Sequence, residues 1–131
     1  MIYQVYQIHL TDEEVDLINS TRNHDAVPAN TLKREMTFSE YNIGVHASEA
    51  WDKGYYTHVA NITAEDYHQV FEIGNIGPEQ NIERMTRMHS VSIGDVIIAE
   101  DGTQVVVDHF GFLAIGHKPE LVQDWAELIA A

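Results

Sequence analysis

The alternation of apolar and polar side chains predicts two strands before the C-terminal third of the chain. The segment IYQVYQIHL, residues 2–10, is rich in β-forming residues and places apolar side chains at most of its even positions. The segment YYTHVANI, residues 55–62, is equally rich in β-forming residues. Both segments are therefore predicted to form strands.

A β-hairpin is predicted in the most regularly patterned stretch of the chain, residues 87–112. VIIAE (96–100) and TQVVVDHF (103–110) are the two predicted strands. Asp101-Gly102 between them is typical of a type I′ turn, in which both central residues take positive φ. This stretch is interpreted mainly as scaffold.

The first helix signal is a capping box. Thr11 precedes Glu14 by three residues, which allows each side chain to bond the backbone amide of the other. Val15 and Ile18 supply an apolar edge to the segment that follows. A short helix ending near Ser20 is therefore predicted.

Two further helices are predicted from apolar residues spaced three and four positions apart. The first begins with Thr63 and Asp66 and ends in GNIGP (74–78). Its buried face is expected to consist of Tyr67, Val70, Phe71 and Gly74. The second begins at Pro119 and is expected to pack on the sheet through Val122, Trp125, Ala126 and Ile129.

Residues 21–50 have the weakest pattern in the chain. TRNHDAVPAN, residues 21–30, is polar and contains Pro28, so an irregular connection is predicted. Further along, ASEAW (47–51) indicates a short helix that Gly54 closes.

This order of elements predicts an α+β fold in which three to four helices pack on a mostly antiparallel sheet. A small, partly closed barrel is the alternative topology. A chain of 131 residues has the usual size of one domain, so residues 1–131 are predicted to fold as a single unit. Within it, residues 1–54 form an N-terminal strand–helix extension, residues 55–115 the central segment, and residues 118–131 the C-terminal helix.

The composition is that of a globular protein with a strongly acidic surface, since 44% of the residues are hydrophobic and the formal charge is −14. The charge opposes direct binding to nucleic-acid phosphates. The chain has no cysteine, which excludes disulfides and thiolate chemistry. No apolar run has the roughly 20 residues that span a membrane, and the N-terminus does not match a signal peptide. No membrane association is therefore expected, and the expected location is the cytoplasm.

Three motifs follow one another between residues 55 and 115. A helix ends in aromatic-x-x-x-Asn (Phe71 to Asn75), Ser-x-Ser-x-Gly-Asp follows at residues 90–95, and the hairpin ends in Val-Asp-x-Phe-Gly-Phe at residues 107–112. This succession resembles the YodL-like family, small domains found in phages, plasmids and conjugative elements. The resemblance implies an origin in a phage or mobile element and an accessory role, and it implies no reaction.

Four residues at the ends of the predicted strands are candidate binding residues: Asp95, Asp108, His109 and Phe112. Asp95 follows a glycine at a turn, where an aspartate more often bonds nearby backbone amides than a metal or substrate. Asp108 and His109 resemble an acid–imidazole pair, but neighbouring strand residues point to opposite faces. Phe110 and Phe112 are expected in the core, because base-stacking platforms need a basic groove.

The spacing of the chain's eight histidines does not match a metal site, because none falls as His-x-His or His-x-x-x-His. Phosphate-binding glycine motifs are also absent from the sequence. No catalytic residue, metal or cofactor is therefore predicted.

The sequence favours a non-enzymatic accessory protein that binds a host or phage protein through its acidic surface. One alternative is an acidic DNA mimic that inhibits a nucleic-acid enzyme, although such mimicry needs carboxylates near the phosphate spacing. The densest acidic cluster is Asp12, Glu13, Glu14 and Asp16. A second alternative is a small metal-dependent enzyme. A homodimer formed by edge pairing of the N-terminal strand is a further hypothesis.

Overall fold

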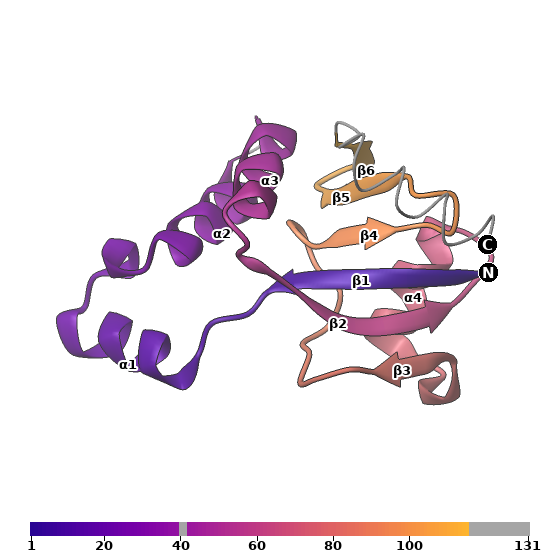
Figure 1. Ribbon diagram of the computed structural model, residues 1–131, viewed down its shortest axis with the longest axis horizontal. Helices are drawn as coiled ribbons and strands as arrows, with labels where there is room; N and C mark the ends of the chain where they lie inside the picture. The colour runs from indigo at the N-terminus through magenta and orange to yellow at the C-terminus, as the bar shows by residue number, and fades with distance from the viewer. Residues whose placement is uncertain (40–41, 116–131) are drawn as a thin grey trace.

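The computed structural model describes residues 1–39 and 42–115, which form an α+β fold around one open, antiparallel sheet (Figure 1). The strands are β1 (Ile2–Ile8), β2 (Tyr56–Thr63), β3 (Ile82–Arg84), β4 (Val96–Ile98), β5 (Gln104–Asp108) and β6 (Gly111–Ala114). Their order in the sheet is β3-β2-β1-β4-β5-β6. The predicted fold class is confirmed, and the sheet does not close into a barrel.

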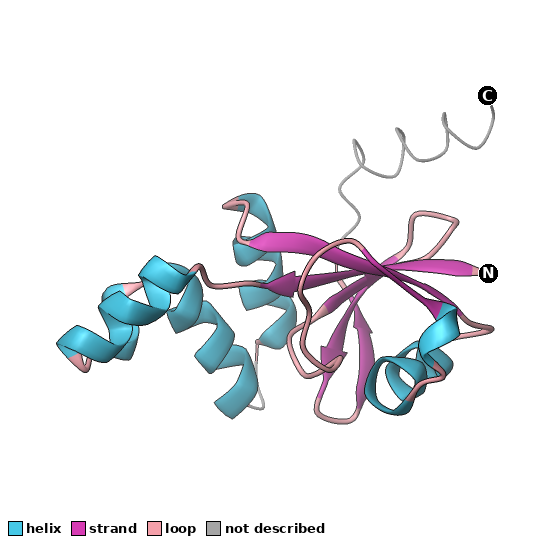
Figure 2. Cartoon of the chain, turned by 90° about the horizontal axis from the view of Figure 1, so that it is seen from below, coloured by secondary structure: helices cyan, strands magenta, loops and turns pink. Residues whose placement is uncertain are grey.

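Four α-helices and two short 3₁₀ turns connect these strands. They are α1 (Asp12–Thr21), η1 (His24–Ala26), α2 (Pro28–Phe38), α3 (Ile43–Asp52), α4 (Tyr67–Ile76) and η2 (Glu79–Asn81). Helices α1 to α3 gather at one side of the sheet, and α4 lies on the other side (Figure 2). The sheet is therefore covered from both faces.

The short strand β4 shows why two hydrophobic clusters are needed. Val96 and Ile98 pack in a cluster that includes Met36 of α2. Ile97, between them, packs in a second cluster that includes Val70 of α4. Alternate side chains of a strand point to opposite faces, so the uninterrupted apolar run of β4 is explained by burial on both sides.

The predicted starts and ends of three helices are confirmed. Glu14 N donates to Thr11 Oγ1 (3.1 Å) and Thr11 N donates to Glu14 Oε1 (2.9 Å), which completes the capping box of α1. Asp66 accepts from Gln69 N (2.8 Å) and caps α4. Helix α3 ends just before Gly54.

The predicted irregular connection at residues 21–30 is wrong in its second half, because Pro28 occupies the first turn of α2. The first turn of a helix leaves its amides unpaired, so a proline loses no hydrogen bond there. Leu32 and Met36 of α2 are buried in the first hydrophobic cluster. Helix α2 is therefore a core element that the polar sequence around Pro28 concealed.

The predicted buried face of α4 needs one correction. Val70 is fully buried, but Phe71 is exposed and Ile73 takes the third core position. Phe71 and Ile73 can each lie beside Val70 on one face of a helix, and the contact of α4 with the sheet decides that Ile73 is the buried one.

The β4–β5 turn is not type I′. Gly102 N donates to Ala99 O (3.0 Å) and Ala99 N donates to Thr103 O (3.0 Å), which closes a three-residue loop. Gly102 has φ 87°, whereas Asp101 is not among the non-glycine residues with positive φ. This is the pattern of a turn followed by a glycine bulge, in which only the glycine needs a positive φ.

The predicted strand at residues 103–110 ends at Asp108, because the chain reverses at His109 and Phe110 and returns as β6. Strands β3 and β6 were not predicted. They occupy the two edges of the sheet, whereas β1 lies between β2 and β4. β1 therefore has no free edge for pairing with a second copy, and the possible homodimer stays a prediction.

The predicted C-terminal helix at residues 118–131 lies outside the described residues. Within residues 1–39 and 42–115, no helix combines the length and the apolar character needed to cross a membrane.

Candidate functional site

The four predicted binding residues lie in three separate places. Asp95 precedes β4 and is only 4% exposed. Asp108 and His109 lie at the turn between β5 and β6, and Phe112 lies in β6. The structure therefore brings only Asp108 and His109 together.

Asp95 is held in a buried network of hydrogen bonds. Its Oδ2 accepts from the Ser92 amide (2.9 Å) and from Gln7 Nε2 (3.0 Å). The neighbouring Gly94 carbonyl accepts from the Tyr56 hydroxyl (2.6 Å). The predicted bond between Asp95 and nearby backbone amides is confirmed.

Burial raises the pKa of the Asp95 carboxyl to about 7. The Ser92 amide, the Gln7 side chain and the positive charge of Lys33 oppose this rise, because each favours the ionised form. A strongly shifted carboxyl is often a sign of a functional site. Here the Asp95 carboxyl is buried, so its raised pKa is explained by its place in the core of the fold.

The residues that carry the YodL-like motifs meet around the segment 89–95. Gln7 Nε2 donates to His89 O (2.9 Å) and Gln7 Oε1 accepts from His89 N (3.2 Å). Asn75 Nδ2 donates to Val91 O (2.9 Å) and to Phe71 O (2.7 Å). The motif residue Asn75 therefore joins α4 to the segment that leads into β4, and Gln7, which lies outside the motifs, joins β1 to the same segment.

Phe112 packs β6 onto α4. Its ring centroid lies 5.7 Å from that of Tyr67 and 5.1 Å from that of His68. It is half-buried against the second hydrophobic cluster. The core placement expected for this phenylalanine is found, whereas the same expectation for Phe110 is wrong, because that ring is almost fully exposed.

Asp108 and His109 hold the β5–β6 turn rather than forming an acid–imidazole pair. Asp108 Oδ1 accepts from the His109 backbone amide (2.6 Å). His109 Nε2 lies 3.1 Å from Ser39 O and 3.3 Å from Met36 O, so this nitrogen carries a proton and donates to the end of α2. The imidazole therefore joins the turn to α2.

Four large apolar side chains are exposed around this turn, and we call them the hairpin patch: Phe38, Val45, Phe110 and Leu113. Their exposed fractions range from 42% to 89%. They belong to the end of α2, the first turn of α3, the turn itself and β6.

Two contacts bring the elements of the hairpin patch together. The His109 imidazole joins the turn to the end of α2. A methyl group placed on Gly44 would lie 3.1 Å from Leu113 Cδ2, which shows that α3 lies against β6. The patch is therefore formed where the end of α2 and the start of α3 meet the β5–β6 turn and β6, which come much later in the sequence.

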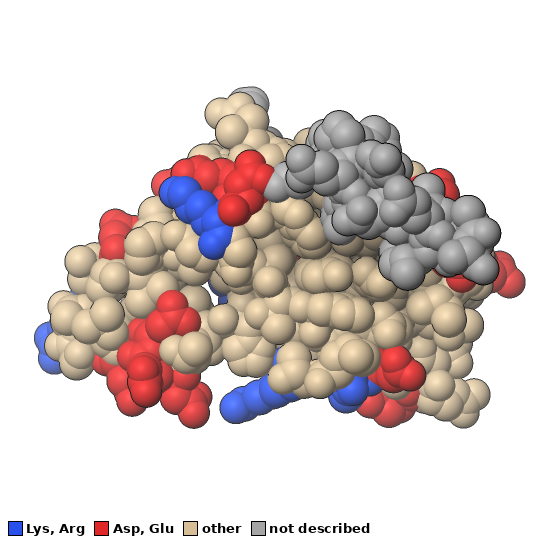
Figure 3. Space-filling model, viewed as in Figure 1, with Lys and Arg blue, Asp and Glu red and all other residues tan. Residues whose placement is uncertain are grey.

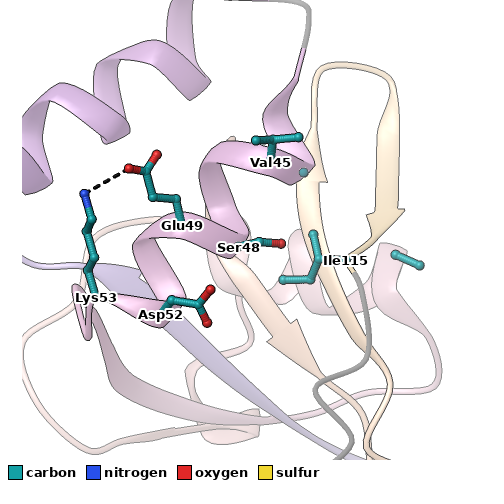
Figure 4. A pocket seen from close by; sticks show the side chains of 8 residues that line it. Val45, Ser48, Glu49, Asp52, Lys53 and Ile115 are labelled. Carbon is teal, nitrogen blue, oxygen red and sulfur yellow. Dashed lines mark hydrogen bonds and ion pairs between the residues drawn. The ribbon is translucent and has the colours of Figure 1, made fainter.

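A groove of about 750 Å³ lies beside the hairpin patch, between α3 and the end of β6 (Figure 4). Its lining residues are Gly44, Val45, Ser48, Glu49, Asp52, Lys53, Ala114 and Ile115. Glu49 and Lys53 form an ion pair (2.9 Å) on the outer side of α3. The groove thus has apolar walls near the patch and charged residues at its rim.

Sequence reasoning selected His109 but missed Phe110, Phe38 and Val45. Phe110 and Phe112 were both expected in the core, and Phe110 was the last residue of the predicted strand 103–110. The Asp at position 108 and the glycine three residues later are a turn signal that would have separated the two rings. Phe38 and Val45 have no such local signal.

No metal-binding cluster is found in the described part of the chain, where no three His, Asp or Glu side chains are grouped for a metal ion.

Comparisons with known proteins identify no relative of this chain. No family model matches the chain, and searches of curated proteins and of solved structures found no match. The YodL-like resemblance therefore stays a prediction, and the functional argument rests on the geometry of the chain.

Proposed function

We propose that the protein is a non-enzymatic accessory protein that binds a protein partner through the hairpin patch. The observation that carries this proposal is the exposure of four large apolar side chains around the β5–β6 turn. Apolar groups gathered on a surface lose contact with water when a partner covers them, so such patches commonly mark interaction sites.

The support beneath the patch suits a binding surface. The His109 imidazole holds the turn that carries Phe110 against α2. A turn fixed before binding loses little conformational entropy when the partner arrives. Phenylalanine also provides large contact area with few rotatable bonds, and aromatic residues are enriched in protein interfaces.

The charge around the patch indicates the chemistry of the partner. Asp52 and the Glu49–Lys53 ion pair line the neighbouring groove, Arg34 lies over the Phe38 ring, and the chain as a whole carries a formal charge of −14. A partner with an apolar centre and a rim of Lys and Arg would complement this surface. The acidic surface therefore sets the charge of the partner, while the patch supplies the contact area.

The non-enzymatic part of the proposal is supported by the way the candidate polar groups are used. Asp95 is sealed in its network, Asp108 accepts from a turn amide, and His109 donates to α2. Each group already has a structural partner in the described residues.

The origin in a phage or mobile element, and hence action in the cytoplasm of a host cell, belongs to this proposal and is supported by the YodL-like motifs alone. Protein binding is favoured over DNA mimicry by the arrangement of the acids on α1, which Figure 3 shows as a group of red side chains. Asp12, Glu13 and Glu14 are consecutive, so they point about 100° apart around the helix rather than in a row.

The experiment uses a photo-crosslinking amino acid at position 110 and, as a matched control, at position 76. Ile76 at the end of α4 is 84% exposed and lies outside the patch. Crosslinking in a lysate of the cells that express the protein is expected to give one discrete protein adduct from position 110 and none from position 76. Mass spectrometry then identifies the adduct.

Binding of the purified, identified partner is then measured by calorimetry. Phe110→Ser is expected to weaken binding at least tenfold, and Ile76→Ser to change it less than twofold. Equal effects of the two substitutions would reject the proposal. An adduct between two copies of this chain, with a dimer in sedimentation, would identify the partner as a second copy.

A further inference from the structure

A hollow of about 510 Å³ is lined by none of the hairpin patch residues. It is formed where the end of β1 meets α1, α2 and the segment that precedes β4. Its volume is in the usual range for small-molecule sites. Nothing in the proposed protein-binding function uses it.

The polar lining of this hollow is mainly basic in a strongly acidic chain. His9, Lys33, Arg87 and His89 line it, and Asp12 is the single acid among the lining residues. The whole chain has seven Lys and Arg residues, so two of the seven share this hollow. Figure 3 shows Lys and Arg atoms at the lower edge of the molecule, across a notch from the acids of α1.

The two strong cations of the hollow form no close ion pair among the described residues, although the charge of Lys33 acts on the buried Asp95 carboxyl. Elsewhere, Lys53 pairs with Glu49 and Arg84 pairs with Glu79. Neither Lys33 nor Arg87 forms an ion pair within 4.0 Å in residues 1–39 and 42–115. The chain has 21 acidic residues, yet none of those described forms a close ion pair with either cation, so both can bind an external anion.

The basic groups are close enough to influence one another. Burial lowers the pKa of His89, and the charges of Lys33 and His9 lower it further, while a bond to Ser90 O opposes this. Mutual repulsion of this kind is relieved when an anion binds between the groups. The basic side chains therefore line one hollow and also repel one another there.

The remaining walls are apolar and include Leu10, Val15 and Met88. An apolar wall beside a basic one suits a ligand that has an anionic head and an apolar body. The acids of α1 next to the hollow repel an extended polyanion such as nucleic acid or an acidic peptide. A small molecule is the ligand that satisfies both conditions.

We infer that this hollow binds a small organic oxyanion, a phosphate monoester or a carboxylate joined to an apolar body, through Lys33, Arg87 and the two histidines. Arg87 offers the fork of donors that fits phosphate or carboxylate oxygens. Lys33 supplies a second charge from α2, and the histidines add donors when protonated.

The test is an NMR titration of the ¹⁵N-labelled full chain with phenyl phosphate, phenylacetate, inorganic phosphate and benzyl alcohol. Saturable shifts of the Lys33, Arg87 and His89 amides are expected with phenyl phosphate or phenylacetate, and the tighter of the two identifies the head group. Inorganic phosphate is expected to bind more weakly, because it lacks the apolar body. Benzyl alcohol is expected to give no saturable shift.

The variants Lys33→Gln and Arg87→Gln are each expected to weaken binding about tenfold, and Lys53→Gln at the distant groove less than twofold. Arg87 is exposed, so its variant keeps the fold even if Lys33→Gln, beside the Asp95 network, is less stable. Saturation by benzyl alcohol as tight as by phenyl phosphate, or equal affinity of Arg87→Gln and the unsubstituted chain, would overturn the inference.

The pH dependence supplies an independent readout. The titratable and charged groups that face His89 across the hollow are His9, which follows β1, Asp12 from α1, Lys33 from α2 and Arg87 from the chain just before His89. A bound anion favours a protonated His89, so the affinity for phenylacetate, whose own charge is constant over this interval, is expected to fall several-fold as the pH rises from about 5.5 to about 8. Affinity that stays constant or rises over this interval would contradict a role for the histidines.

Discussion

Two segments that flank the β4–β5 hairpin use similar residues and have opposite surroundings. The segment 89–95 enters β4 with Gly94 and Asp95, and the β5–β6 turn leaves β5 with Asp108 and ends at Gly111. Both aspartates accept a bond from a nearby backbone amide. Local turn chemistry is therefore common to the two segments.

The difference between them lies in what the rest of the fold supplies. Gln7 of β1, Tyr56 of β2 and Asn75 of α4 all bond to the segment 89–95. The β5–β6 turn is joined to another helix through the His109 imidazole, and it exposes Phe110. The same motif thus becomes scaffold where three elements surround it and a contact surface where the fold leaves one side open.

The largest expected consequence of this difference is a pH-dependent stability that originates in Asp95. The pKa of its carboxyl is raised to about 7 in the folded chain, above the value of about 4 in an unfolded chain. Between these two values the folded state binds more protons, so the free energy of unfolding falls as the pH rises from about 4 to about 7. The Asp95 contribution to this fall is up to about 4 kcal/mol, at 1.36 kcal/mol per pKa unit.

Asp95→Asn isolates this contribution, because an amide keeps an acceptor for the Ser92 amide and does not titrate. Urea unfolding at a series of pH values gives the stability difference between the variant and the unsubstituted chain. We expect the difference to shift in favour of the variant as the pH rises through this interval. A difference that is constant from pH 4 to pH 8 would show that Asp95 ionises as easily as an exposed aspartate.

The next largest effect is expected from Gln7→Leu, which fills the same space without the amide. Gln7 is fully buried and makes bonds to His89 and to Asp95. Leaving these buried groups without a partner is expected to cost about 3 kcal/mol in free energy of unfolding. Gln4→Leu, in the same strand but only half-buried, is the control and is expected to cost less than about 1 kcal/mol. Equal losses would mean that the segment 89–95 does not depend on β1.

A pair of helical glycines tests the packing of the same two regions. A methyl group on Gly74 of α4 would lie 2.3 Å from Val91 Cγ2, inside the segment 89–95. A methyl group on Gly44 of α3 would lie 3.1 Å from the exposed Leu113 side chain, which can move away. Both substitutions gain about 1 kcal/mol of helix propensity.

For Gly74→Ala we expect overpacking to outweigh the helix gain and to lower the free energy of unfolding by about 1 to 2 kcal/mol, because Val91 is buried and held by Asn75. Gly44→Ala is expected to be neutral or stabilising. Chemical denaturation of the two variants measures both values. A destabilised Gly44→Ala beside an unaffected Gly74→Ala would show that α3 packs more tightly on β6 than α4 packs on the segment 89–95.

The sequence predicts the parts of the fold that depend on short-range signals. Three local patterns are each compatible with only one local structure: the Thr11 capping box, the Asp66 cap and the apolar run of β4. Pro28 and the Asp101-Gly102 turn were misread, because each local pattern is compatible with two backbone geometries. Contacts with distant elements decide between such geometries, and a single sequence does not show them.

The candidate sites illustrate the same limit. The bond of Asp95 to a nearby backbone amide was predicted correctly, since it is local. The hairpin patch joins α2, α3 and β6, and the basic hollow joins β1, α1, α2 and the segment before β4. Neither has a motif in the sequence, because the residues of each are brought together only by the order of strands in the sheet.

The smallest expected effect comes from the exposed turn. Asp108→Ala removes the acceptor of the His109 amide, and water can replace it because the turn lies at the surface. We expect a loss of less than about 1 kcal/mol in free energy of unfolding. Asp108→Asn keeps an acceptor and is expected to lose less. If Asp108→Ala lost as much as Gln7→Leu, the turn would be part of the scaffold and the contrast between the two segments would disappear.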